Sequence, residues 1–496
     1  MTKFCYAAAL FIDVSMSPGT TTSISRTAAE HHGPPTSAIS RFQQYWQCNV
    51  PPAWALLAVI LPIPRFRVVD HVDPTEVIAL SQFASGRISD LALPDPTLAQ
   101  SRKMEFFEDN PVSMTSESVL RDASRVTRLE NVGEQQFQGR LRAWLEIADA
   151  EDDRTELGRA MIRQLCVRFV STRLRFTDLI SRNPQILDET IEAPIVIVGP
   201  FRSGTTHLVN LLAADSRLRS LPLWESYEPI RASNLQVDED MRIRRETGAR
   251  AWHELHEMLP MLRAMRPVEP DHVHEDVELF GPDFGLLRWE TLAIVRPWPD
   301  VSMSHADQLP HYIFMRDMLK ALQWQRGPRR WVLKAPHHAE HLDVLMKVFP
   351  DATVVVTYRD PLAIVSSVAT LAAYLSRLEY RAVDLEVLGE YWMDRIDRLL
   401  RGGMNGARFV PERQLVEVDF QDFMIHKLDV VRKVYESADL EIHLTQLERM
   451  NSYLSGHPRK KDGQIVYDLA RDFNIAPVDL RERFSYYYER YPGVNV

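Results

Sequence analysis

The sequence predicts an α/β fold with a central parallel sheet flanked by helices, preceded by an N-terminal helical region. Three short apolar, β-branched runs support this prediction, each followed by a helical pattern: Ile195–Val198, Trp331–Leu333 and Ala352–Tyr358. Unbroken runs of this length are typical of strands that are buried on both faces of a parallel sheet. The composition, 45% hydrophobic and 25% charged over 496 residues, excludes a disordered or disulfide-stapled protein.

Three parts can be distinguished along the chain. Residues 1–115 are irregular, begin with a stretch rich in Ser, Thr and Pro, and form an extension of unknown role. Residues 116–190 form a helical lead-in, because their apolar residues recur at the spacing of a helix face, as at Leu141, Trp144, Leu145 and Ala148. Residues 191–496 carry the strands and the motifs below and form the main domain. A further strand is expected at Gln414–Val418, and a final helix at Val478–Tyr491.

The charge and the cysteine content limit the partners and the cellular compartment that can be expected. Lys and Arg total 58 against 68 Asp and Glu, a net charge of −10, so binding of nucleic acid by a basic surface is not expected. The three cysteines are far apart in sequence, which favours a reducing, cytoplasmic compartment over a disulfide framework. The most apolar stretch, Val50–Pro64, is too short to cross a membrane and is bounded by prolines.

The strongest motif is the loop Gly199–Thr206 (GPFRSGTT), which follows a predicted strand and opens a predicted helix. Glycines allow close backbone approach, and a helix N-terminus adds partial positive charge, so the loop suits a phosphate or a sulfate. Its spacing resembles a Walker A loop, but Thr205 occupies the position of the Walker lysine. The basic residue is instead Arg202, inside the loop.

A second motif follows the later strand. Asp360 is expected to cap a helix that opens with Pro361. Ser367 lies two turns after that cap, so it and Arg359 can face the same way and bind one phosphate by a hydroxyl and a charge contact.

Together these two motifs resemble those of the sulfotransferases that use 3′-phosphoadenosine 5′-phosphosulfate (PAPS). The resemblance implies a P-loop-like three-layer sandwich and assigns residues 191–496 to the PAPS-binding domain. The residues that match the phosphosulfate loop are Arg202, Ser203, Gly204, Thr205 and Thr206, and those that match the 3′-phosphate clamp are Arg359 and Ser367. The likeness is greatest to a bacterial branch with an N-terminal helical region, related to the tyrosylprotein-type enzymes. Those branches carry Arg at position 202, whereas the cytosolic enzymes carry Lys.

The resemblance also implies catalytic roles. Arg202 would meet the leaving oxygen, and Lys334 resembles a lysine that assists it. Two positions compete for the base: Glu225 resembles the catalytic glutamate of the tyrosylprotein branch, while Glu275, with His274 beside it, resembles the base of other branches. The sequence leaves this choice open.

Later segments complete the expected site. The basic turn Arg459, Lys460 and Lys461 is expected to fold over the nucleotide. His337 and His338 lack the spacing of zinc-protease ligands, so no metal is expected and both are predicted to line the acceptor pocket. The many apolar residues within 234–311 suggest a lipid, steroid or isoprenoid alcohol as acceptor.

The predicted function is therefore metal-independent, in-line transfer of a sulfuryl group from PAPS to a hydroxyl of a small or lipid-like acceptor, which releases 3′-phosphoadenosine 5′-phosphate. Two alternatives remain at this stage: a P-loop kinase or NTPase with a deviant loop, and a catalytically inactive nucleotide-binding module. No nucleic acid and no transmembrane span are expected. The predicted location is cytoplasmic, with peripheral attachment to a membrane as a variant, and the sequence gives no oligomeric state.

Overall fold

The computed structural model describes residues 86–232, 235–266, 269–285, 308–458 and 463–494, and it confirms the predicted α/β fold. Five parallel strands form one sheet in the order β2-β3-β1-β4-β5. Their bounds are Ile195–Val198 for β1, Leu218–Arg219 for β2, Arg330–Lys334 for β3, Thr353–Tyr358 for β4 and Leu415–Asp419 for β5. The two-residue β2 was not expected, because a strand this short has no periodicity that a sequence pattern can reveal.

Strand β1 lies at the centre of the sheet. Its Ile195 pairs with Val332 of β3 on one side and with Thr353 of β4 on the other. All four of its side chains are fully buried, as an unbroken β-branched run predicts. The carboxyl ends of β1, β3 and β4 therefore meet at one edge of the sheet, and each of the predicted motifs follows one of these ends.

The sheet is the middle layer of three. Val196, Val198 and Leu333 face a core shared with α14 to α17, whereas Ile195 and Ile197 face a second core built with α9, α19 and α20. This division follows from strand geometry, because successive side chains point to opposite faces. The helices of these two outer layers are α9 (Thr205–Ala213), α14 (Gln308–Arg326), α15 (Leu342–Val348), α16 (Pro361–Ser376), α17 (Leu385–Gly406), α18 (Phe420–Ile425), α19 (Lys427–Ser437) and α20 (Leu444–Gly456).

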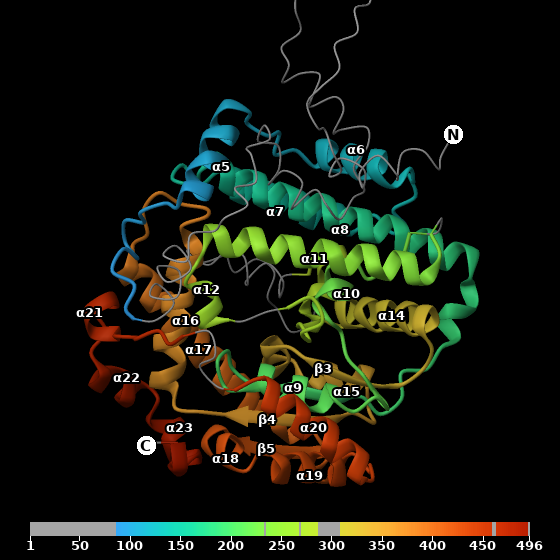
Figure 1. Cartoon of the computed structure of the whole chain (residues 1–496), viewed down its shortest axis with the longest axis vertical. Coiled ribbons are helices and arrows are strands. Elements are labelled where there is room, and N and C mark those ends of the chain that lie inside the picture. The colour runs from blue at the N-terminus through green and yellow to red at the C-terminus, as the bar shows by residue number, and fades with distance from the viewer. Residues whose placement is uncertain (1–85, 233–234, 267–268, 286–307, 459–462, 495–496) are drawn as a thin grey trace, which may run out of the picture. The chain divides into compact units, whose positions relative to one another are not determined.

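A helical region precedes the sheet, as the sequence predicts (Figure 1). It has its own core, in which the Trp144 ring packs edge-on against Phe169 and Phe284. The helices before β1 are α5 (Leu98–Asp109), α6 (Ser116–Thr127), α7 (Phe137–Asp149) and α8 (Glu156–Arg182). Between β2 and α14 lie α10 (Leu223–Tyr227), α11 (Val237–Met258), α12 (Leu262–Met265) and the 3₁₀ segment η3 (Asp276–Asp283).

Two helical predictions were wrong. Residues up to 115 were expected to be irregular, yet α5 is a helix closed by a reciprocal capping box between Thr97 and Gln100. The expected single helix at Val478–Tyr491 is two helices, α22 (Pro477–Arg483) and α23 (Ser485–Arg490), which follow α21 (Leu469–Phe473). The break falls at Phe484, whose backbone (φ −93°, ψ 16°) departs from helical values and whose side chain is fully buried in the main core.

Candidate functional site

The loop Gly199–Gly204 joins β1 to α9 and packs closely against β4. A Cβ at Gly199 would lie 2.1 Å from the Thr357 Oγ1 atom of β4, so only glycine fits at this position. The hydroxyls of Ser203 and Thr357 are 2.6 Å apart, and the Ser203 hydroxyl also donates to the Pro200 carbonyl at 2.6 Å. Thr357 was missed in the sequence, although it stands two residues before the recognised Arg359.

The backbone of this loop is wound in the left-handed region at two positions, Arg202 (φ 67°) and Gly204 (φ 87°). Glycine adopts this conformation freely, whereas arginine does so rarely. Helix α9 then begins at Thr205, so its free amide groups point toward the loop. An arginine held in an uncommon conformation at a helix N-terminus is the arrangement expected of an anion site.

The second motif is built as predicted. The Asp360 carboxylate accepts a hydrogen bond from the Leu362 amide at 3.0 Å, and Pro361 is the first residue of α16. The Tyr488 hydroxyl of α23 donates to the same carboxylate at 2.6 Å, so a C-terminal helix stabilises the corner between β4 and α16. The corner places Arg359 just ahead of the helix.

The two motifs are in direct contact. The Arg359 guanidinium donates to the backbone carbonyl of Arg202 at 2.6 Å and lies 4.2 Å from the centre of the Phe420 ring. The Arg202 Nε atom in turn donates to the Ser367 hydroxyl at 3.0 Å. The structure thus brings together the three residues that the sequence assigned to two different phosphate contacts.

Lys334 and Glu275 form an ion pair beside the loop. The Lys334 Nζ atom lies 2.7 Å from a Glu275 carboxylate oxygen and 3.4 Å from the Thr206 hydroxyl at the start of α9. Burial alone would raise the pKa of Glu275, but the charges of Lys334 and Arg266 outweigh it and lower that pKa to about 2. Glu275 is therefore ionised at neutral pH, next to a cation that contacts the start of α9.

Arg266 is a further cation of the site, which the sequence did not reveal. It follows α12, and its guanidinium lies 3.1 Å from the His274 Nδ1 atom. Its charge acts on Arg202 as well as on Lys334 and Glu275. No pattern marks this arginine in the sequence, because it stands between elements and approaches the loop only through the tertiary fold.

Glu225, the other candidate base, has a different environment. It is fully buried in α10, and its two carboxylate oxygens bind Arg219 at 3.3 Å and Arg326 at 2.7 Å. Arg219 pairs with Trp331 near the start of β3, three residues before Lys334, or about 10 Å along the strand. The structure therefore does not bring Glu225 into the contacts that join Lys334, Glu275 and the loop.

His274 is engaged on both sides of its ring. Its Nε2 atom lies 3.5 Å from Glu278, opposite the Arg266 contact at Nδ1. Burial lowers the pKa of His274, which leaves it a weak base. The remaining predicted residues, Arg459, Lys460 and Lys461, lie outside the described residues.

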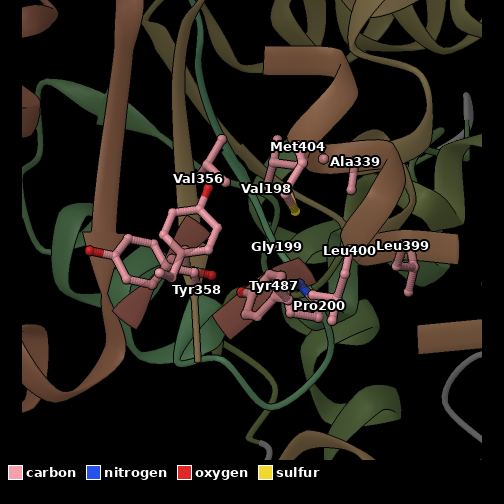
Figure 2. Close-up of a pocket in the computed structure, with 13 residues that line it drawn as sticks. Val198, Gly199, Pro200, Ala339, Val356, Tyr358, Leu399, Leu400, Met404 and Tyr487 are labelled. Carbon is pink, nitrogen blue, oxygen red and sulfur yellow. The ribbon is translucent and has the colours of Figure 1, made fainter. Parts of the chain in front are cut away.

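A small pocket lies behind the loop. Figure 2 shows Gly199 and Pro200 facing Leu400 of α17 and Tyr487 of α23. Its other lining side chains are mostly apolar, among them Val356 and Met404. The rear of the loop is thus supported by packing between β1, β4 and two helices.

Within the described ranges, no helix has the length and apolar character needed to span a bilayer. Across the same ranges, no three His, Cys, Asp or Glu side chains are grouped so that they could hold a metal ion.

Comparison with known proteins agrees with this geometry. The model of the sulfotransferase family matches residues 194–444, about half of the chain, from β1 to the start of α20. A curated relative, the omega-hydroxy-beta-dihydromenaquinone-9 sulfotransferase Stf3 of Mycobacterium tuberculosis, is 25% identical over 294 residues, 54% of this chain and 69% of its own. The protein of the same name from Mycobacterium bovis matches equally.

Two solved structures share the fold. Sulfotransferase STF9 from Mycobacterium avium superposes with a TM-score of 0.67 at 23% identity, over 77% of this chain and 97% of that one. Sulfotransferase STF1 from Mycobacterium tuberculosis gives 0.60 at 23% identity, over 75% and 98%. Because the family model covers about half of the chain, including β1, β3, β4 and the loops that follow them, the chain belongs to the sulfotransferase family.

Proposed function

We propose that this sulfotransferase moves the sulfuryl group of PAPS to a hydroxyl of a lipid-like acceptor. The observation that carries the proposal is the Lys334–Glu275 pair, joined at 2.7 Å and in contact with Thr206 of the anion loop. It sets an ionised carboxylate, which can take a proton, beside a cation that can stabilise a leaving phosphate.

The donor fits the residues present. Arg202, the loop amides and the N-terminus of α9 supply positive charge for a phosphosulfate. Burial lowers the pKa of the Arg202 guanidinium because desolvation disfavours its charged form. A bound anion would stabilise that charge. Arg359 and Ser367 would hold the 3′-phosphate, with Arg459 and Lys460 as further contacts.

We assign the proton transfer to Glu275. Its carboxylate takes the acceptor proton while the acceptor oxygen attacks sulfur in line, a new O–S bond forms, and the S–O bond to the 5′-phosphate breaks. The electron pair of that bond passes to the phosphate oxygen, where Arg202 and Lys334 stabilise it. A bound phosphosulfate beside Lys334 adds negative charge, which raises the pKa of Glu275 and makes it a stronger base.

The acceptor class follows from the curated relatives, which are named for a hydroxylated menaquinone. We propose a hydroxylated isoprenoid or a similar lipid alcohol for this chain. Such an acceptor is held in a membrane, so the proposal includes peripheral contact with a lipid surface.

Product analysis tests the proposal. The purified protein is incubated with PAPS and a panel of lipid alcohols, including farnesol and an ω-hydroxylated menaquinone, and sulfated products are sought by mass spectrometry. We expect a sulfated alcohol that disappears in Arg202→Ala protein. In parallel, 3′-phosphoadenosine 5′-phosphate should raise the thermal midpoint and ATP with Mg²⁺ should not. The reverse ranking would support a kinase, and nucleotide binding without any product would support an inactive module.

A further inference from the structure

Two adjacent histidines after β3 differ sharply in their surroundings. His337 and His338 both lie in the 3₁₀ segment η6 (Pro336–Glu340), three and four residues after Lys334. Their exposed fractions are 1% and 0%. Sequence reasoning treated them alike, as lining of the acceptor pocket.

His338 is fully satisfied by protein groups. Its Nε2 atom lies 3.1 Å from the Asp276 carboxylate, and its Nδ1 atom lies 2.8 Å from the Tyr312 hydroxyl of α14. Asp276 is the residue after Glu275, so this buried chain of three groups fixes the turn that carries the candidate base. A ligand that bound His338 would have to break these contacts.

His337 has no such partners. Among the described residues, neither of its ring nitrogens has a hydrogen-bond partner, although the side chain is almost completely buried. Buried polar groups in native proteins are nearly always hydrogen-bonded, so an unpartnered imidazole calls for a ligand. Its ring stands edge-on to Phe201, the loop residue before Arg202, with 5.8 Å between ring centres.

The charge state of His337 limits the kind of ligand. Burial lowers its pKa well below the ordinary value, the charge of Arg395 lowers it further, and Glu275 is near enough to act in the opposite direction. The imidazole is therefore neutral, with one N–H donor and one acceptor nitrogen. A neutral ring suits a neutral hydroxyl, whereas the anionic donor already has Arg202 and Lys334.

We propose that His337 is the hydroxyl-binding residue of the acceptor subsite, which lies between the loop and Glu275. The His337 N–H donates to the acceptor oxygen, and the hydroxyl donates its own proton to Glu275. No proton passes to or from His337 during transfer. The half-buried Phe201 side chain turns aside as the acceptor enters. This inference rests on the proposed function and names the residue that selects for a hydroxyl.

The adjacent histidine provides a matched control. His337→Phe and His337→Leu remove an unpartnered polar group, so both should raise the thermal midpoint, whereas His338→Phe should lower it because Asp276 and Tyr312 lose their partner. His337→Phe should leave 3′-phosphoadenosine 5′-phosphate affinity within about twofold and raise the acceptor KM at least about tenfold. His337→Gln, which keeps an N–H donor, should recover part of that loss.

Each outcome has a separate meaning, with the acceptor from the product analysis as probe. A normal acceptor KM in His337→Phe and His337→Leu would show that the residue only fills space. A lower affinity for 3′-phosphoadenosine 5′-phosphate would move His337 to the donor site, and a lower thermal midpoint in both variants would show that its ring nitrogens have partners in the protein. Each of these overturns the inference. If the parent protein sulfates no alcohol at all, the proposed function itself fails.

Discussion

At the scale of single residues, Arg202 is the point where the two nucleotide motifs meet. Its backbone carbonyl accepts from Arg359, and its side chain donates to Ser367. Both contacts hold a residue whose φ of 67° is uncommon for a side chain with a Cβ. The loop is therefore preorganised by groups that also belong to the expected 3′-phosphate clamp.

Removing the Arg202 side chain should disable the loop. We expect Arg202→Ala to lower kcat by about 10² to 10³, because it removes a charge-assisted contact to the leaving group. Arg202→Lys should retain more activity, since a charge remains without the forked geometry. Steady-state rates and calorimetric affinity for 3′-phosphoadenosine 5′-phosphate measure the effect. Arg242→Ala, at an exposed pair on α11, is the control; equal rates for all of these proteins would contradict the assignment.

The two candidate bases are separated by one pair of substitutions. Glu275→Gln keeps the size of the side chain and removes the basic oxygen, so kcat should fall by about 10² to 10⁴. It also leaves the buried Lys334 charge without its partner, so the thermal midpoint should fall as well. Glu225→Gln instead weakens a buried pair with Arg219 and Arg326, so it should chiefly lower the thermal midpoint. A larger loss of kcat in folded Glu225→Gln protein would reverse the two roles.

The low pKa of Glu275 predicts the shape of the pH profile. Because its folded-state pKa of about 2 lies below the ordinary value near 4.3, the carboxylate stays ionised until the pH falls toward 2. Its contribution to stability is present above the ordinary value and is lost only below it. A plot of kcat/KM should then show no acid limb from the base between about pH 5 and pH 8. An acid limb inside that range would show that a group other than Glu275 takes the proton.

At the scale of helices and strands, the elements that could be predicted were those marked by a local sequence pattern. The strands β1, β3 and β4 were found because buried parallel strands are continuous apolar runs, and the start of α16 was found from its cap and proline. Helix α5 was missed because its twelve residues include only one buried apolar residue, Phe107, although the Thr97 capping box was readable. The break at Phe484 was missed because no glycine or proline stands between Val478 and Tyr491 to mark a helix end.

The residues of the site can be divided in the same way, into those that a local sequence pattern marks and those that only the tertiary fold brings together. The site residues Arg202, Lys334, Arg359 and Ser367 stand at or just after strand ends, or on the helix that follows. Because the carboxyl ends of parallel strands share one edge, sequence reasoning could place these residues together. The choice between Glu225 and Glu275 could not be made, because both lie in the long connection from β2 to α14, whose path is set by packing. Pro222 and Val273 pair antiparallel there, and the two glutamates leave that bridge in opposite directions.

The corner between β4 and α16 should distinguish nucleotides by their 3′-phosphate. We expect Arg359→Ala to weaken 3′-phosphoadenosine 5′-phosphate binding by about 10- to 100-fold, and to weaken adenosine 5′-phosphosulfate, which lacks that phosphate, much less. Ser367→Ala should show a smaller effect of the same kind. Isothermal titration measures both ligands, with Ser366→Ala as the neighbouring control. Equal losses for the two nucleotides would show that Arg359 acts only through the Arg202 carbonyl.

At the scale of the whole molecule, the site depends on parts that are distant in the chain. The loop after β1 is supported by Thr357 of β4, by Phe420 under Arg359 and by Tyr488 on Asp360. The region before the sheet is tied to the same body, since Arg154 between α7 and α8 contacts both Glu379 and Tyr380 after α16. Truncation at either end of the described body should therefore disturb the catalytic edge.

The central position of β1 has a consequence for biogenesis. Both of its neighbours come much later in the chain, since about 130 residues separate β1 from β3 and β4 follows still later. At about 5 to 20 residues per second, the ribosome needs roughly 7 to 26 s to supply the first partner. During that interval an apolar strand has two unpaired edges, the situation that invites aggregation. Nascent chains stalled about halfway between β1 and β3, where β1 has left the ribosomal exit tunnel but β3 has not been made, should therefore bind trigger factor or Hsp70 more strongly than chains stalled after residue 440. Ribosome pull-down of the two lengths would reveal the difference.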